Sequence, residues 1–419
     1  MNDPLQFSYP TKTPSIIKVI GVGGGGGNAV THMYREGIHD VTFVLCNTDN
    51  QALLTSEVPI KIQLGRELTQ GLGAGNKPDV AKRAAEESED DLRKLMNDGT
   101  KMVFITAGMG GGTGTGAAPI VAKIAKEMGV LTVAIVTIPF MFEGRPKILQ
   151  ALNGVEEISK HVDALLVVNN ERLREIYRNL TVDNAFRKAD DTLTIAAKSI
   201  AEIITLPGVI NLDFADVNTT LKDGGVAIMS SGTASGEGRL SEAISNALSS
   251  PLLNNNDVFR AKKILVNVVY SESSPLMMDE MDFLHDFMAK FNANIHVIWG
   301  TAKDDDLGEN VSVTILATGF GVEGILLMKE NIDIQATLKE QEEAEAKARK
   351  ESELLEKYYG PNAPRYIQMK KPKPIILSDD QLDDDEVIKL IADNPTYNRD
   401  SGLVKKLMEK TMARRQGEE

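Results

Sequence analysis

The chain has 419 residues, of which 42% are hydrophobic and 25% charged, so it can fill the cores of two domains with length left over. Its formal net charge of -14 argues against sequence-independent nucleic-acid binding, which needs a basic surface. The single cysteine, Cys46, excludes a disulfide framework and a cysteine-based zinc site, as is typical of a reducing cytoplasm.

The amino-terminal segment carries no recognisable targeting signal. Residues 1–15 are polar and contain prolines, which indicates a flexible arm rather than a signal peptide. No apolar run reaches the ~18 residues that a transmembrane helix needs. The five histidines are scattered, so no metal cluster is expected. We therefore expect a cytoplasmic protein.

Apolar runs in the first half of the chain predict six strands. They are residues 16–22, 41–46, 60–64, 102–106, 130–140 and 164–170. Helical patterns lie between them, including one expected helix over 79–96. Unbroken apolar strands that alternate with helices are typical of a Rossmann-like parallel sheet covered on both faces.

Two glycine-rich turns follow two of these strands. Residues 23–27 are five consecutive glycines followed by Asn28, and six more glycines lie between Gly108 and Gly116. A backbone without Cβ atoms lets a phosphate approach its N–H groups, and the helix that follows adds partial positive charge. The Walker motif G-x-x-x-x-G-K-[ST] does not occur. Two such turns suit a nucleoside triphosphate held between them.

A nicotinamide-dependent dehydrogenase is a competing interpretation. Gly21, Gly23 and Gly26 match the motif G-x-G-x-x-G, and Asp49 follows the next strand at a distance that suits a ribose contact. Such an enzyme does not need the second glycine turn, however. Protection against thermal unfolding by NADH, but not by GTP, would favour it.

Three residues are candidates for binding the base of the nucleotide. Asn170 ends a predicted strand, and Asp190 lies one helical turn after Phe186 on the next helix. A carboxylate can accept the N1–H and N2–H₂ donors of guanine together, and an aromatic ring can stack on the base. From spacing alone, a solvated face for Asp190 and a core position for Phe186 are equally good interpretations.

A long amphipathic helix is predicted over residues 183–208, where a proline and a glycine end it. It leads to a second α/β region. Just after the helix, Asp213 and Asp216 stand three residues apart. At a helix start the two acids share a face, where they either cap the helix or polarise a water molecule. Their residue types alone favour capping.

Seven motifs, taken in their order, resemble those of the tubulin/FtsZ family of GTPases, and within it the bacterial cell-division proteins. The motifs are GVGGGGGNAV, NTDNQAL, LTQGLGAGNKP, GGGTGTG, PFMFEG, AFRKADD and NLDFADV. The resemblance covers about residues 16–320. It implies a GTP-binding and GTP-hydrolysing cytoskeletal protein that polymerises head-to-tail into filaments of the division ring at the cell septum.

The resemblance also implies site residues. Nucleotide binding falls on Gly24, Gly25, Gly26, Gly27, Asn28, Gly110, Gly111, Gly112, Thr113, Gly114, Glu143, Lys147, Asn170, Phe186 and Asp190. The two glycine turns would hold the phosphates, Glu143 the ribose, and the last three residues guanine. Catalysis falls on Asn211, Asp213 and Asp216, which would enter the next subunit's site, where the two acids position or activate the attacking water. Mg²⁺ is expected on the phosphates, where it neutralises charge.

Two positions depart from the family pattern. Lys147 replaces a usual arginine, which makes Arg145 the alternative phosphate contact, and Ala81 replaces a glycine. The resemblance divides the chain into six parts. They are a flexible arm (1–15), a GTP-binding domain (16–182), the central helix (183–208), a GTPase-activating α/β domain (209–320), a disordered linker (321–385) and a partner-binding tail (386–419).

The tail loosely matches the peptide by which the family recruits membrane tethers and division proteins at mid-cell. Its apolar stripe beside lysines and arginines, over residues 403–415, is either a partner-binding helix or a segment that lies on an anionic membrane. A non-polymerising, tubulin-like scaffold is the remaining alternative. We would expect such a protein to have lost the acids of NLDFADV, which this chain retains.

Overall fold

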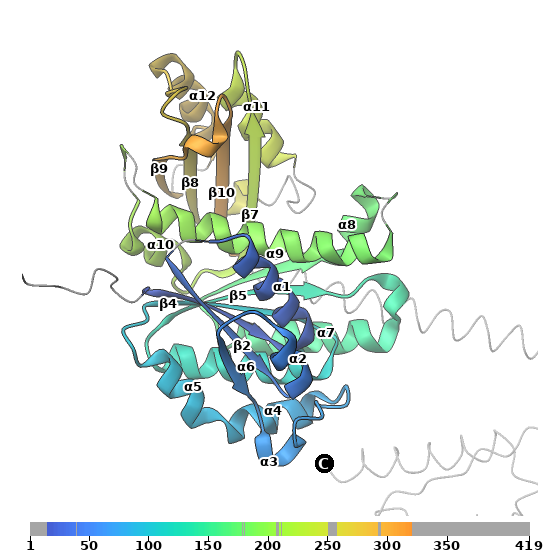
Figure 1. Ribbon diagram of the computed structural model, residues 1–419. Coiled ribbons are helices and arrows are strands. Elements are labelled where there is room, and N and C mark those ends of the chain that lie inside the picture. Colours follow the sequence, from blue (N-terminus) through green and yellow to red (C-terminus); the bar gives the residue numbers. More distant parts are fainter. Residues whose placement is uncertain are drawn as a thin grey trace, which may run out of the picture. The chain divides into compact units, whose positions relative to one another are not determined.

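The structure is a computed structural model that describes residues 15–320, except 39, 178, 180, 207–208, 211, 250–257 and 292–294. The predicted linker and tail, and all but the last residue of the predicted arm, lie outside this part. The described residues form one ten-stranded sheet in the order β3-β2-β1-β4-β5-β6-β7-β10-β8-β9. Helices lie on both faces of its first half (Figure 1).

The first half of the sheet is parallel, and all six predicted strands are present. They are β1 (Ile17–Val22), β2 (Val41–Asn47), β3 (Ile60–Gln63), β4 (Met102–Gly108), β5 (Leu131–Ile138) and β6 (Ala164–Asn169). Each pairs in parallel with its neighbours. β5 is buried along its whole length and β4 along nearly all of it, as their unbroken apolar runs predict.

Helices cover both faces of this parallel half. They are α1 (Gly23–Arg35), α2 (Asn50–Thr55), α3 (Arg66–Thr69), α4 (Pro78–Glu87), α5 (Glu89–Met96), α6 (Gly112–Glu127), α7 (Arg145–Ser159), α8 (Asn170–Ile176) and α9 (Val182–Thr205), with a short 3₁₀ turn at Met141–Glu143. Phe104 and Ile105 of β4 point to opposite faces. Phe104 packs in the core beneath α1 and α9, and Ile105 in the core beneath α4, α6 and α7.

The single helix predicted over 79–96 is wrong, because the chain breaks at Ser88 into α4 and α5. Ser88 leaves the helical conformation, with φ −98° and ψ 16°. Its buried hydroxyl accepts a hydrogen bond from the Gly65 N–H at 3.0 Å. This contact with a residue 23 positions earlier gives no periodic signal, so the hydrophobic pattern alone continues across the break.

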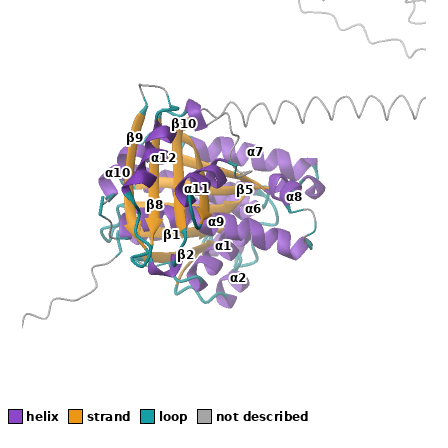
Figure 2. Ribbon diagram, turned by 90° about the horizontal axis from the view of Figure 1, so that it is seen from above, coloured by secondary structure: helices purple, strands orange, loops and turns teal. Residues whose placement is uncertain are grey.

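The second α/β region continues the same sheet, which the sequence did not predict. Its elements are α10 (Phe214–Leu221), β7 (Gly225–Ala234), α11 (Arg239–Leu248), β8 (Lys263–Tyr270), α12 (Met278–Met288), β9 (His296–Lys303) and β10 (Val311–Phe320), with 3₁₀ turns at Val258–Arg260 and Asp305–Leu307. β7 joins β6 in parallel through three residue pairs, and β10 runs antiparallel to β7 and β8. Figure 2 shows α11 and α12 over these strands.

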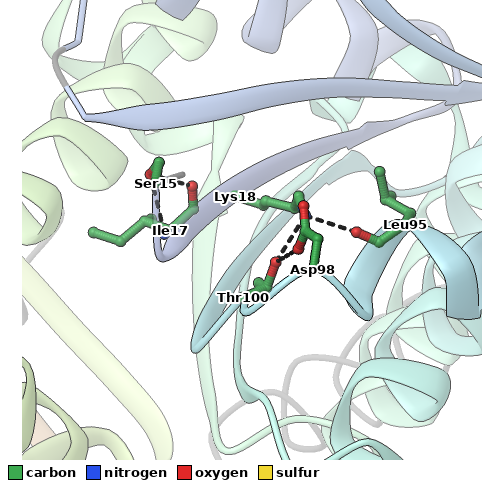
Figure 3. Close-up of polar contacts among 6 residues, drawn as sticks. All are labelled: Ser15, Ile17, Lys18, Leu95, Asp98 and Thr100. Atoms are coloured by element: carbon green, nitrogen blue, oxygen red, sulfur yellow. Dashed lines mark hydrogen bonds and ion pairs between the residues drawn. The ribbon is translucent and has the colours of Figure 1, made fainter. Parts of the chain in front are cut away.

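A buried lysine anchors the sheet at the edge where β1 begins (Figure 3). Lys18 is only 1% exposed. Its Nζ donates to the Leu95 carbonyl at 2.6 Å, to Thr100 Oγ1 at 2.7 Å and to the Asp98 carboxylate at 2.5 Å. The end of α5 and the approach to β4 are thereby fixed to β1. Among the described helices, none is both long and apolar enough to cross a membrane.

Candidate functional site

The two predicted glycine turns meet at the carboxyl edge of the parallel strands. β1 and β4 are neighbours, with Val22 in register with Ala107, and each strand runs into a turn that opens a helix, α1 or α6. A Cβ built on Gly25 would lie 3.2 Å from the Cα of Gly108, so the two turns are in backbone contact. Their helix N-termini therefore present N–H groups and partial positive charge at one place.

The glycines of these turns serve two different purposes. Gly26 and Gly114 are needed for packing, because a Cβ would lie 2.2 Å from the Thr106 oxygen and 2.4 Å from the Gly108 oxygen, respectively. A second group has no atom within 4 Å of a built Cβ, and its members are Gly24, Gly27 and Gly111. Packing does not explain these three glycines, but the close approach of a ligand would.

A cavity of about 620 Å³ opens beside the first turn, and this volume is typical of a small-molecule site. Four of the predicted residues line it, namely Gly24, Gly27, Asn28 and Asp190. His32 and Arg187, which the sequence analysis did not single out, also line it. His32 follows Asn28 by one helical turn, so the helical period could have indicated its place.

The predicted base-binding residues lie at the start of α8 and in the first half of α9. Asn170 opens α8 and is 5% exposed, and its Oδ1 has no hydrogen-bond partner among the described residues. A buried polar atom without a partner is costly, so the site fits a ligand that donates to it. Phe186 is 40% exposed and meets the ring of Phe140 edge to face at 5.2 Å. The exposed part of its side chain remains available for stacking.

The surroundings of Asp190 raise the pKa of its carboxyl group, as expected for a buried carboxylate without a bound donor. Burial raises its pKa to about 6, His32 acts to lower it and Asp191 to raise it. His32 Nε2 lies 3.0 Å from Asp191 Oδ1 and is therefore engaged with the neighbouring acid. A guanine edge, with two parallel N–H donors, would restore the interactions that the Asp190 carboxylate loses on burial.

The predicted ribose and phosphate contacts on the 3₁₀ turn and α7 are paired with each other. Lys147 Nζ lies 2.6 Å from Glu143 Oε2, and Glu143 Oε1 accepts from the Phe140 N–H at 2.9 Å. Gln150, which sequence reasoning missed, donates to the carbonyls of Gly110 and Gly111 at 3.0 and 3.1 Å. Gln150 thereby links α7 to the second glycine turn.

The two predicted acids begin a helix far from this cavity. Asp213 is the N-cap of α10, and its carboxylate accepts from the N–H groups of Ala215 and Asp216. In return, Asp216 Oδ2 accepts a hydrogen bond from the Asp213 N–H at 3.1 Å. Capping, which the residue types favoured, is therefore present in the structure. Asn211 lies outside the described residues.

Comparisons with known proteins agree with this arrangement. A sequence model of the Tubulin/FtsZ family GTPase domain matches residues 16–178, and one of the FtsZ family C-terminal domain matches residues 225–321. The cell division protein FtsZ of Porphyromonas gingivalis is 53% identical over 412 residues, which cover 96% of this chain and 90% of that relative. The chain belongs to the Tubulin/FtsZ family.

Further relatives and solved structures agree with the predicted fold. The cell division protein FtsZ of Aquifex aeolicus is 42% identical over 81% of this chain and 91% of its own. The FtsZ dimer of M. jannaschii has a TM-score of 0.68 at 41% identity and covers 74% of this chain and 89% of that one. CetZ1 of Haloferax volcanii, at 20% identity and a TM-score of 0.66, shares the fold. The predicted GTPase activity, with its ligands GTP and GDP, follows from the family.

Proposed function

We propose that this cell-division GTPase binds GTP at the edge where the two glycine turns meet and polymerises head-to-tail, so that the acids of one subunit complete hydrolysis in the next. The N-termini of α1 and α6 hold the phosphates. Asn170 and Asp190 accept from guanine, and Phe186 stacks on it. Support comes from the orphaned Asn170 oxygen, the unpacked glycines and the cavity that Gly24 and Gly27 share with Asp190.

One observation carries the proposal that hydrolysis is completed in trans. Two of the proposed guanine-binding residues, Phe186 and Asp190, lie on the first half of α9, and Asp213 follows its far end. From Asp190 to Thr205, the last residue of α9, the helix advances by 15 residues, which at the α-helical rise is about 22 Å. Figure 1 shows α8 and α10 at opposite ends of α9. A carboxylate at that distance cannot reach the nucleotide of its own chain, but a neighbouring copy can supply one.

Exposed apolar side chains lie both near the glycine turns and just before the two acids, and they support a contact between copies of the chain. Leu72, on the loop after α3, is 86% exposed, and that loop bonds through the Gly73 N–H to the Thr48 carbonyl beside the glycine turns. Val209 and Ile210, just before the acids, are 75% and 41% exposed. Two different apolar surfaces that meet head-to-tail make a heterologous contact, which extends into a filament when it does not close.

The mechanism then divides the work between two subunits. One chain binds and orients the triphosphate, and the partner's acids at the start of α10 orient the attacking water and accept its proton. Mg²⁺ bound to the phosphates supplies charge neutralisation. Within the described part, no group of three or more His, Cys, Asp or Glu side chains is placed to hold a metal. Mg²⁺ held by phosphates and water needs no such group.

The remaining predictions concern the tail and the place of action. We propose that residues 386–419, which lie outside the described part, bind membrane-tethering and division proteins and bring the filaments to the mid-cell division site. The six-part division of the chain likewise stays a proposal. A GTP-dependent increase in light scattering and in pelletable protein is expected for the full chain, whereas a non-polymerising scaffold gives neither.

Mixing two defective variants tests hydrolysis in trans. Gly27→Leu places a side chain into the open cavity and blocks nucleotide binding, and Asp213→Asn removes the acid's charge. Each is expected to be inactive alone. In an equimolar mixture, the intact nucleotide site of the Asp213→Asn chain meets the intact acids of the other, and turnover returns.

The readout is phosphate release per active site, with each protein alone as the reference. Recovery of a substantial part of wild-type turnover in the mixture supports the shared site. A mixture as inactive as its components, although both proteins pellet together with GTP, would show that each chain must use its own acids. Asp223→Asn, an exposed acid beyond α10, is the matched control for the charge change.

A further inference from the structure

A buried hydroxyl pair joins two loops of the site. Thr48 follows β2 and is fully buried, and Thr113 lies in the first turn of α6. Their Oγ1 atoms are 2.7 Å apart. Among the described residues, the Thr48 hydroxyl has no other hydrogen bond. Because a fully buried hydroxyl needs a partner, Thr113 is the group that satisfies it.

The backbone of Thr48 is itself held firmly. Its carbonyl accepts from the Thr69 hydroxyl of α3 at 3.3 Å and from the Gly73 N–H at 3.2 Å. Thr69 is buried too and also bonds the Gly65 carbonyl at 2.9 Å. The backbone of Thr48 is therefore held by two neighbouring segments, and its hydroxyl contacts Thr113 from this fixed position.

The chemistry of phosphate decides which hydroxyl donates in the hydrogen bond between Thr48 and Thr113. A phosphate oxygen near neutral pH accepts hydrogen bonds, so a Thr113 hydroxyl that binds it must donate its single proton there. The Thr48 hydroxyl can then only donate to Thr113. We propose that Thr48 is a positioning residue for GTP, which orients and polarises the Thr113 hydroxyl towards a phosphate oxygen. This inference rests on the proposed place of Thr113 at the phosphates.

The test compares the full-length wild type with Thr48→Val, Thr113→Val, the double variant and Thr48→Ser. Binding of GTP and of GDP is titrated without Mg²⁺ below the polymerising concentration, and turnover is measured with Mg²⁺. Thr48→Val is expected to weaken binding about three- to fivefold, the effect of one ordinary hydrogen bond. KM rises by the same factor with kcat unchanged, because the lost interaction serves binding. Thr48→Ser restores both.

The double variant distinguishes orientation from general structural support. If Thr48 acts through Thr113, the double variant binds no more weakly than Thr113→Val alone. Three outcomes would each overturn the role of Thr48. In the first, the losses of affinity in the two single variants multiply in the double variant. In the others, Thr48→Ser binds as weakly as Thr48→Val, or Thr48→Val binds like the wild type. Wild-type binding by Thr113→Val would instead overturn the proposed phosphate site. Melting temperatures are compared throughout, and Thr48→Ala replaces the valine variant if that does not fold.

Discussion

Asp213 and Asp216 each accept a hydrogen bond from the backbone N–H of the other, both at 3.1 Å, across the first turn of α10. This reciprocal capping box stabilises the helix start and also fixes both carboxylates relative to the backbone. The capping and catalytic interpretations of the two acids are therefore compatible. The cap is what holds the acids in place for a neighbouring subunit.

The cap and the charge of Asp213 can be separated by substitution. Asparagine caps helices about as well as aspartate, so Asp213→Asn should leave the melting temperature almost unchanged. We expect it to lower GTP turnover at least about 100-fold, since it loses the general base. Asp213→Ala should lose about 1 kcal/mol of stability in addition. Wild-type turnover by Asp213→Asn at polymerising concentration would exclude the catalytic role.

Guanine affinity should depend on pH through Asp190. Its folded pKa, raised to about 6 by burial, exceeds the ordinary value of 3.8. The free folded chain therefore holds this proton more tightly than the unfolded chain, and its stabilising contribution falls as pH rises from about 4 to 6. Nucleotide binding needs the ionised form, so the GDP affinity should fall about tenfold per pH unit well below 6.

Two variants test whether Asp190 is the group responsible for this pH dependence. Asp190→Asn should bind GDP weakly and with no step near pH 6. His32 acts to lower the pKa of Asp190, so His32→Gln should keep the step and move it to higher pH. Titrations between pH 5 and 8 check both, and a step that survives in Asp190→Asn would belong to another group.

Substitution by alanine should have opposite effects on stability at an open glycine and at a packed glycine. Gly27→Ala meets no atom within 4 Å and improves helix propensity by up to about 1 kcal/mol, so the melting temperature should rise. Its methyl group enters the cavity, and GTP affinity should fall about tenfold or more. Gly26→Ala drives a Cβ against the Thr106 oxygen and should destabilise the fold instead. Calorimetric melting and GTP titration distinguish the two.

Lys18 and Asp98 should respond unequally to substitution. Asp98→Ala leaves the buried Lys18 charge without its counter-ion, and loss of about 3 kcal/mol is expected. Lys18→Met removes the buried charge and leaves Asp98, whose side chain is 52% exposed, to water, so it should cost less. Urea unfolding of both variants checks the order. A larger loss for Lys18→Met would mean that its packing and neutral hydrogen bonds dominate.

This ion pair should also protect the fold against acid. Burial acts to raise the pKa of Asp98, but hydrogen bonds from Lys18 and Thr100 outweigh it and lower the pKa below its ordinary value of 3.8. The pair therefore contributes its stability above about pH 4 and loses it as pH falls through the lowered pKa. Lys18→Met should flatten the decline in unfolding free energy over that acidic window.

The sequence by itself determined the order of strands and helices, the two glycine turns and the long central helix, because these depend on local periodicity and on the conformations of single residues. It also placed Asp213 and Asp216 at a helix start. Those features needed only neighbours along the chain.

Only the tertiary structure decided which partners these elements meet. It divided the glycines into those that pack against other atoms and those that have open space beside them. It brought Thr48 to Thr113 across 65 residues and ended a helix at Ser88. It also joined the two predicted α/β regions through the pairing of β6 with β7. It also placed the acids beyond the end of α9 that lies farther from Phe186 and Asp190. Each of these depends on contacts between distant segments, which hydrophobic periodicity does not encode.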